Sequence, residues 1–191
     1  MTLIGFLGKK HRGKDTCCNY IVDTYGYRSN SFAGPLKRGI KEWFGFTNDQ
    51  LYTESKEEVD NNWGISPRET FQIIGTKLKN DIIPELLPDL NEGFWIKLFD
   101  IWYERNKDRD VVISDVRSQE EVDYIRSKGG IILKINRSEC EEYEIVDSDM
   151  HETETCVDNI KNFTMEIDNN GTLEELHLKL DNIVKLFSLS I

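Results

Sequence analysis

Short apolar runs alternate with longer stretches of helical periodicity along this chain of 191 residues. Apolar runs occupy residues 2–7, 110–115 and 131–135, and residues 163–167 give a fourth candidate. A short apolar run bounded by turn residues is typical of a strand that is buried on both faces of a parallel sheet. We therefore predict four strands at these positions.

Helices are predicted between the strands. Residues 14–25 follow the first strand, and Pro35 opens a second helix toward Phe44, since proline is tolerated in a first helical turn. Further helices are predicted over 94–103 and 119–127. Strands that alternate with helices predict an α/β fold with a mainly parallel sheet.

Two sequence motifs mark helix starts. Ser66-Pro67-Arg68-Glu69 and Thr172-Leu173-Glu174-Glu175 each place a hydroxyl three residues before a glutamate, so that the two side chains cap each other's backbone. Between the two motifs, Pro84 and Pro88 predict an irregular link. Residues 47–62 are polar and show no clear period, so no element is predicted there.

Composition narrows the function classes. Hydrophobic residues make up 38% and charged residues 31% of the chain, as in an ordinary globular protein. The net charge of −11 disfavours binding to a polymeric nucleic acid, because such binding requires clustered cations. No apolar run reaches the length of a membrane span, and residues 1–7 lack the basic flank of a secretory signal.

The cysteines indicate a reducing compartment. Cys17, Cys18, Cys140 and Cys156 show neither the spacing of a zinc site nor a dense disulfide framework. We expect four thiols in a cytoplasmic protein. No repeat, low-complexity tract or linker divides residues 1–191, so a single domain is predicted, and a homodimer is left open.

The segment Gly8-Lys9-Lys10-His11-Arg12-Gly13-Lys14-Asp15 matches the pattern GxxxxGK directly after a predicted strand and before a predicted helix. This is the context that a P-loop requires. The glycines let backbone amides turn inward around a β-phosphate, and the following helix presents its positive end. We predict that Gly8, Lys10, Gly13 and Lys14 bind ATP, with Lys14 on the β- and γ-phosphates.

Two places carry candidate magnesium ligands. Asp15 stands where a P-loop usually offers serine or threonine, and Thr16 supplies a hydroxyl beside it. At the carboxyl end of a buried strand, where open α/β sheets bind ligands, Asp115 is predicted to hold Mg²⁺ or its water shell. Arg117 is predicted to clamp a phosphate. Alternatively, Asp115 caps the helix that starts at Gln119.

Several further elements occur in a fixed order: Gly13 to Thr16, Ala33 to Lys37, Pro67-Arg68 with Gln72 and Gly75-Thr76, Trp95, Asp115 to Arg117, Gly129-Gly130, His151 to Glu154, and Asn169 to Thr172. In these elements the chain resembles the bacteriophage-type deoxynucleoside monophosphate kinases nearly end to end. The resemblance implies a three-layer P-loop NTPase fold and an enzyme that transfers the γ-phosphate of ATP to a deoxynucleoside monophosphate. The chain is similar, less completely, to dephospho-coenzyme A kinase and to animal phosphomevalonate kinase.

The resemblance also implies where the acceptor binds. A nucleoside monophosphate site would be built from Lys37, Arg68 and Gln72, with Arg117 nearby, in a helical insertion at about 34–105. A lid would lie at about 137–155. The loop Asn169-Asn170-Gly171 would lie beside the adenine of ATP.

Phosphoryl transfer requires aligned phosphates, excluded water and cations that match the developing negative charge. We therefore predict that Arg12 and Arg137 converge on the γ-phosphate. Mg²⁺ would bridge the phosphates under Asp15, Thr16 and Asp115. The acceptor phosphate is already ionised at neutral pH and serves as its own nucleophile.

Two alternatives stay open. A kinase for phosphomevalonate or dephospho-coenzyme A would need a denser cationic pocket, whereas a nucleotide acceptor predicts an aromatic stacking surface. Trp63 and Phe71, beside the amide of Gln72, are candidates for that surface. A non-catalytic nucleotide-binding regulatory protein would keep the P-loop but would need fewer converging cations than this sequence offers.

Overall fold

The computed structural model of the chain describes residues 2–90, 93–138 and 156–188. Apart from its first two positions, the predicted lid at 137–155 lies outside these residues. The chain forms two compact units, which are described separately. The sheet unit contains Met1–Ser31 and Tyr103–Ile191, and the helical unit contains Phe32–Trp102.

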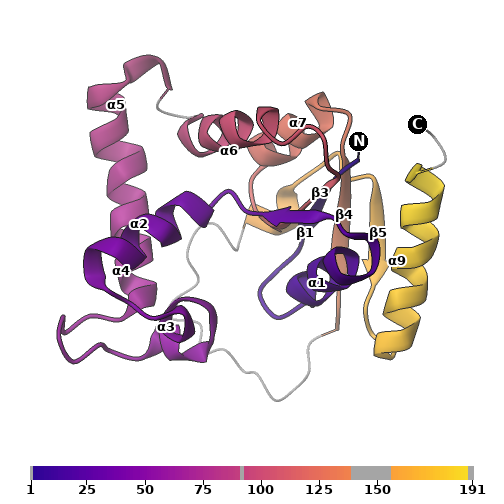
Figure 1. Cartoon of the computed structure of the whole chain (residues 1–191), viewed down its shortest axis with the longest axis horizontal. Coiled ribbons are helices and arrows are strands. Elements are labelled where there is room, and N and C mark those ends of the chain that lie inside the picture. Colours follow the sequence, from indigo (N-terminus) through magenta and orange to yellow (C-terminus); the bar gives the residue numbers. More distant parts are fainter. Residues whose placement is uncertain (1, 91–92, 139–155, 189–191) are drawn as a thin grey trace. The chain divides into compact units, whose positions relative to one another are not determined.

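In the described part of the sheet unit, five parallel strands lie in the order β2-β3-β1-β4-β5 (Figure 1). Their bounds are β1 Leu3–Leu7, β2 Arg28–Asn30, β3 Val111–Val116, β4 Ile131–Asn136 and β5 Met165–Asp168. The predicted parallel sheet is confirmed. The sequence pattern missed β2, because this strand is short and polar, and it placed the start of β5 two residues early.

Helices cover both faces of this sheet. On one face, α1 (Lys14–Tyr25) and α9 (Leu173–Ser188) pack over a buried cluster that includes Ile4, Phe6 and Leu133. Gly5 faces the opposite side, since successive residues of a strand alternate, and there it lies against Ile125 of α7 (Gln119–Ser127). The sheet unit therefore has the three layers that the resemblance implied.

The first and last helices of the sheet unit are joined by polar contacts. The Asp181 carboxylate on α9 accepts hydrogen bonds from the hydroxyls of Tyr20 and Tyr25 on α1, at 2.8 and 2.6 Å. These bonds lower the pKa of Asp181. The His177 ring stacks on Tyr20 with 3.7 Å between centroids. This seam holds α1, and therefore the loop that precedes it, against the C-terminal helix.

The helical unit is built around a small core of Ile40, Phe46 and Leu51. Its elements are α2 (Gly34–Phe44), α3 (Asn48–Tyr52), a 3-10 turn Glu54–Glu57, α4 (Pro67–Lys77), a π-helical turn Leu78–Ile82, α5 (Ile83–Leu86), a 3-10 turn Pro88–Leu90 and most of α6 (Phe94–Glu104), whose last two residues are counted in the sheet unit. The capping box of Ser66 and Glu69 is present as predicted.

Two expectations for the helical unit need correction. The link at Pro84 and Pro88 is mostly helical, because Pro84 lies in the first turn of α5, where its missing N–H is not needed. Residues 47–62 contain α3, which begins with a capping box between Thr47 and Gln50. None of the helices in the described ranges has the length and apolar character that a membrane span requires.

Candidate functional site

The predicted catalytic residues of the sheet unit follow the ends of neighbouring strands. In the register of the sheet, Leu7 of β1 pairs with Val116 of β3 and with Lys134 of β4. Asn136 of β4 in turn pairs with Asp168 of β5. Parallel strands end at one edge, so the residues that follow them lie along that edge: Gly8, Arg117, Arg137 and Asn169. This is where open α/β sheets bind ligands.

The backbone of residues 8–13 forms an open cradle. Gly8 has φ +156°, and a Cβ there would lie 2.7 Å from the carbonyl oxygen of Ile135, so the loop can approach β4 closely. Gly13 is the N-cap of α1 with φ +95°, a left-handed conformation that favours glycine. Since Gly13 has no side chain to cap the helix, the first-turn amides of α1 are left for an anion.

Lys14 lies inside this cradle. Only 9% of its surface is exposed, and its Nζ donates a hydrogen bond of 2.6 Å to the carbonyl oxygen of Lys9. The ammonium group is therefore held over the loop backbone, where a bound phosphate would meet it. Lys10 and Arg12 are half-buried in the same loop, and Arg12 lines a small polar hollow of about 60 Å³ with Gly8 and Asn136.

Asp115 and Arg117 flank the end of β3, and both are half-buried. The helix that follows is capped by Ser118, whose hydroxyl accepts from the Glu121 amide, so the alternative cap by Asp115 is wrong. The Glu121 Oε2 accepts from the backbone N–H groups of Arg117 and Ser118, at 2.7 and 3.1 Å. Glu121 was not among the predicted site residues, because the spacing Ser118-x-x-Glu121 indicates a capping box but not the contact with Arg117.

The charge environment links Asp15 to Asp115. Burial raises the pKa of the Cys18 thiol, and the charges of Asp15 and Asp115 both raise it further. Burial also raises the pKa of Glu121 to about 7, with Asp115 as the next cause. The carboxylates of Asp15 and Asp115 thus both lie near enough to the Cys18 thiol to raise its pKa.

This donor set fits Mg²⁺ bound mainly through water and phosphate oxygens, which is how Mg²⁺ is usually held beside nucleotides. Asp15 and Thr16 are exposed on the first turn of α1, and Asp115 is half-buried. Among residues 2–90, 93–138 and 156–188, no group of three or more His, Cys, Asp or Glu side chains forms a closed metal cage.

The loop after β5 meets the P-loop. Asn169 is buried, and its Nδ2 donates 2.9 Å to the carbonyl oxygen of Arg12. Asn170 and Gly171 are exposed, and Asn170 contacts the segment that follows β4 through the Ser138 amide. Arg137 is exposed immediately before Ser138. The structure therefore brings the P-loop, the end of β4 and the loop after β5 together in the sheet unit.

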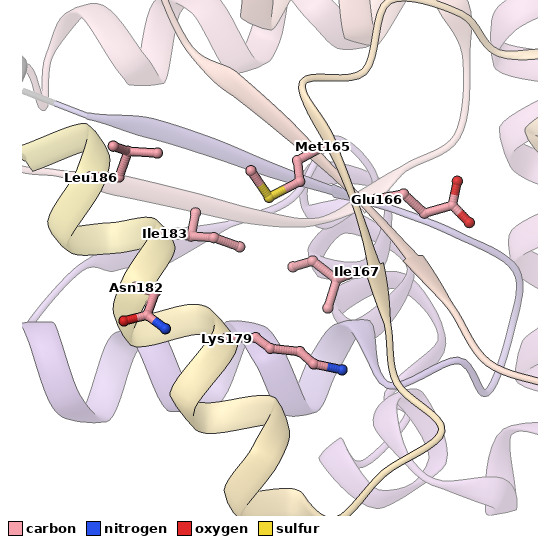
Figure 2. A pocket seen from close by; sticks show the side chains of 7 residues that line it. All are labelled: Met165, Glu166, Ile167, Lys179, Asn182, Ile183 and Leu186. Carbon is pink, nitrogen blue, oxygen red and sulfur yellow. The ribbon is translucent and has the colours of Figure 1, made fainter.

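A larger hollow, of about 270 Å³, lies elsewhere between β5 and α9. Figure 2 shows Met165, Ile183 and Leu186 facing one another there, while Glu166 points away from α9. The Nζ of Lys179, the cation that lines this hollow, donates to the carbonyl oxygen of Asp168 at 2.6 Å. An apolar lining with one cation does not suit phosphates, so the candidate site is the P-loop edge.

In the helical unit, Lys37 of α2 has its Nζ 5.0 Å from the centre of the Tyr52 ring, a cation–π contact. Arg68 and Gln72 both lie on α4 and are half-buried. A spacing of four residues puts these two side chains on one face of the helix. A cation and an amide are therefore presented together from one helix.

The two aromatic candidates differ in environment. Trp63 is 50% exposed, and it is anchored by its Nε1, which donates 2.9 Å to the Phe44 carbonyl oxygen. Phe44 also packs edge-on against it, with 5.2 Å between ring centroids. Phe71, by contrast, is half-buried against the core of the helical unit. Trp63 thus offers the more accessible ring face of the two.

Comparisons with known proteins agree with this geometry. A family model described as deoxynucleotide monophosphate kinase matches residues 41–180. A protein of Acanthamoeba polyphaga mimivirus, provisionally named a deoxynucleotide monophosphate kinase, is 37% identical over 191 residues, and 96% of each chain is covered. The deoxynucleotide monophosphate kinase of Enterobacteria phage T4 is 26% identical over 76% of this chain, which spans 56% of that phage protein's length.

Solved structures share the fold. The dephospho-CoA kinase from Campylobacter jejuni superposes with a TM-score of 0.50 at 13% identity, covering 98% of each chain. A sugar kinase from Janibacter gives the same TM-score of 0.50 at 10% identity, over 94% of this chain and 91% of its own. These two likenesses concern the fold alone. The family match and the viral relative show that the chain belongs to the deoxynucleotide monophosphate kinase family, whose members are phosphotransferases.

Proposed function

We propose that this protein transfers the γ-phosphate of ATP to a deoxynucleoside monophosphate through the edge of the sheet unit. The observation that carries the proposal is the open start of α1. A glycine N-cap leaves the first-turn amides free of any side-chain cap, with the buried Lys14 held over the loop. Aligned amides and an ammonium group are suited to a polyphosphate.

Each cation has a role in the proposed reaction. Lys14 and the loop amides hold the β- and γ-phosphates of ATP, while Arg12 and Arg137 stabilise the charge on the transferring group. Arg117 orients the acceptor phosphate, and the Glu121 carboxylate fixes its backbone. The acceptor oxygen attacks as an anion, so no side chain has to remove a proton.

Mg²⁺ is part of the same proposal. Asp15, Thr16 and Asp115 would hold it, largely through water, and when bound it neutralises charge on the phosphate oxygens. The support is the position of the donors: Asp15 and Thr16 are exposed on the first turn of α1, and Asp115 lies near the end of the neighbouring strand β3.

The acceptor side rests on the helical unit. Lys37, Arg68 and Gln72 would bind the monophosphate and its base, with Trp63 and Phe71 as stacking surface. Support comes from the shared face of Arg68 and Gln72 on α4. A ring and an amide suit a nucleobase better than they suit phosphomevalonate, which has no aromatic group.

The proposal extends to partners and compartment. The protein acts on small molecules and binds neither a polymeric nucleic acid nor a membrane. The net charge of −11 supports the first of these two exclusions. Cys17 and Cys18 are buried free thiols, as a cytoplasmic setting requires. A homodimer would leave this chemistry unchanged.

A substrate panel tests the proposal. ADP release from MgATP would be measured with every ribo- and deoxyribonucleoside monophosphate, and with phosphomevalonate and dephospho-coenzyme A. We expect release with deoxynucleotides and none with the two other acceptors. Release with a non-nucleotide acceptor alone would point to the other class of kinase, and tight ATP binding without acceptor-dependent release would point to a regulatory protein.

A charge variant tests the acceptor side. Lys37→Met is expected to raise KM for the monophosphate about tenfold, with little change in KM for ATP, because one charge-assisted phosphate contact is lost. Lys41→Met removes the same charge from the same helix, where Nζ donates to Asn48, and serves as the control. Equal effects of the two variants would exclude a specific role for Lys37.

A further inference from the structure

The loop between β5 and α9 contacts both segments that carry arginines of the ATP site. Asn169 uses its side chain on one segment, where Nδ2 donates 2.9 Å to the Arg12 carbonyl oxygen. It uses its backbone on the other, where its N–H donates 2.7 Å to the Asn136 carbonyl oxygen. One residue thus joins the P-loop to the end of β4.

The side chain of Asn169 is buried beside Gly13. Only 8% of the residue is exposed, and a Cβ placed on Gly13 would lie 2.5 Å from Nδ2. The amide therefore occupies the space that any larger residue at position 13 would need. A buried amide is stabilised by a hydrogen bond that it cannot exchange for water, so this contact is expected to persist.

Asn170 completes the arrangement. Its Oδ1 accepts 2.7 Å from the Ser138 N–H, and its Nδ2 donates to the exposed Asp168 carboxylate. Together with the bond to Asn136, this holds the backbone on both sides of Arg137. The Arg137 side chain itself is exposed.

We propose that Asn169 and Asn170 are positioning residues that fix the backbones of Arg12 and Arg137, so that both guanidinium groups reach the same phosphate. The inference rests on the proposed function, which assigns both arginines to the transferring phosphate. A long side chain magnifies any rotation of its backbone, and a displacement of about 1 Å can cost 10²-fold in rate. Because one loop fixes both backbones, it also fixes the positions of the two arginines relative to each other.

This role differs from a contact with adenine. Loss of an adenine contact weakens ATP binding in the ground state, so KM for ATP would rise while kcat stays unchanged. Loss of a positioning contact lowers kcat, whereas the affinity for ADP, which lacks the transferring phosphate, stays unchanged. Steady-state kinetics and ADP calorimetry on the Asn169→Ala variant separate the two, and a rise in KM alone would overturn the proposal.

Double-mutant cycles test the assignment of each asparagine. We expect Asn169→Ala to lower kcat about tenfold in the wild-type background but less than about threefold when Arg12 is already alanine, because the effect acts through Arg12. Asn170→Ala should couple in the same way to Arg137→Ala. Additive losses in both cycles would overturn the inference while leaving the proposed function intact. Full activity of both arginine variants would overturn both proposals.

Charge-matched variants supply a second test. Asn169→Asp keeps the shape but loses the donor to the Arg12 carbonyl, so kcat should fall as far as in the alanine variant. Asn170→Asp adds the same charge and loses the donor to Asp168, but it keeps the oxygen that accepts from Ser138, so kcat should fall less than in the Asn169→Asp variant. Asn182→Ala on the exposed face of α9 controls for loss of an amide, with no change expected. The reverse order of the two aspartate variants would contradict the proposal.

Discussion

Two helices begin after neighbouring strands of the sheet, and their first turns have opposite chemistry. α1 follows β1 and starts at Gly13, which has no side chain to offer. α7 follows β3 and starts at Ser118, where Glu121 completes a capping box. Both helices pack on the same sheet. Since α7 does so with a capped start, an uncapped start is not a requirement of the fold. In the proposed function, the open turn binds phosphate, whereas the closed turn at Ser118 is capped by the protein itself.

The two helix starts also differ in the groups that lie near their first-turn backbone amides. At α7, the protein supplies its own acceptor, the Oε2 of Glu121, to the amides of Arg117 and Ser118. At α1, no side chain caps the first turn, and the buried Lys14 donates to the Lys9 carbonyl oxygen in the preceding loop. The four variants below break or sharpen this contrast.

The largest effect is expected from Lys14→Met. Loss of the buried ammonium group should lower kcat about 10²–10³-fold, because charge on the transferring phosphates is no longer matched. Methionine has a similar length, so thermal unfolding should change little. The exposed Lys161→Met is the control for charge loss and should keep full activity. An unchanged rate in the Lys14 variant would remove the P-loop from the mechanism.

Filling the open turn should have the next largest effect. Gly13→Ala forces a left-handed residue and a contact at 2.5 Å with Asn169, so kcat should fall about 10²-fold through displacement of the loop. Gly26, at the other end of α1, has φ +72° and open space around it, so Gly26→Ala measures the backbone cost alone, about 1–2 kcal/mol. Chemical unfolding and kinetics on both variants give the comparison, and equal losses of activity would show that the cradle geometry is unimportant.

Opening the closed turn should have a smaller effect. Glu121→Ala leaves the amides of Arg117 and Ser118 without their carboxylate, which should cost about 1–2 kcal/mol of unfolding free energy. If Arg117 binds the acceptor, KM for the monophosphate should rise severalfold. Glu175→Ala removes the matching partner of Thr172 at the start of α9 and gives the cost of an exposed cap. A Glu121 variant with unchanged stability would contradict the buried cap.

Glu121→Gln keeps an acceptor in place and should change activity least. The pKa of Glu121 is raised from 4.5 to about 7, chiefly by burial, so the folded state favours the protonated carboxyl group. The contribution of this raised pKa to the free energy of unfolding is fully present below pH 4.5 and is lost as the pH rises through about 7. The unfolding free energy of wild type relative to the glutamine variant should therefore fall across that window. Urea titrations from pH 4.5 to 8 measure it, and parallel curves would contradict the shift.

Local signals predicted much of this molecule. The bounds 14–25 of α1 and 119–127 of α7, and the capping boxes at Ser66 and Thr172, are all set by residues within a few positions, and the structure confirms them. The GxxxxGK segment is local in the same sense. Where a residue's role depends on its sequence neighbours, the pattern was sufficient.

Long-range pairing could not be predicted in this way. β2 is polar and becomes a strand only because it pairs with β3. The bond from Asn169 to Arg12 joins residues 157 positions apart, so no local pattern encodes it. Glu121 was missed for a different reason, since a capping box explains its sequence spacing without indicating that it holds Arg117.

The central position of β1 has a consequence for biosynthesis. β1 pairs with β3 on one side and β4 on the other, and the contact from Thr2 to Asp110 spans 108 residues. A ribosome therefore releases the amino-terminal strand and the glycine-rich turn long before either flanking strand exists. Closing so long a loop slows folding, and the nascent chain acquires its nucleotide affinity only when synthesis is well advanced.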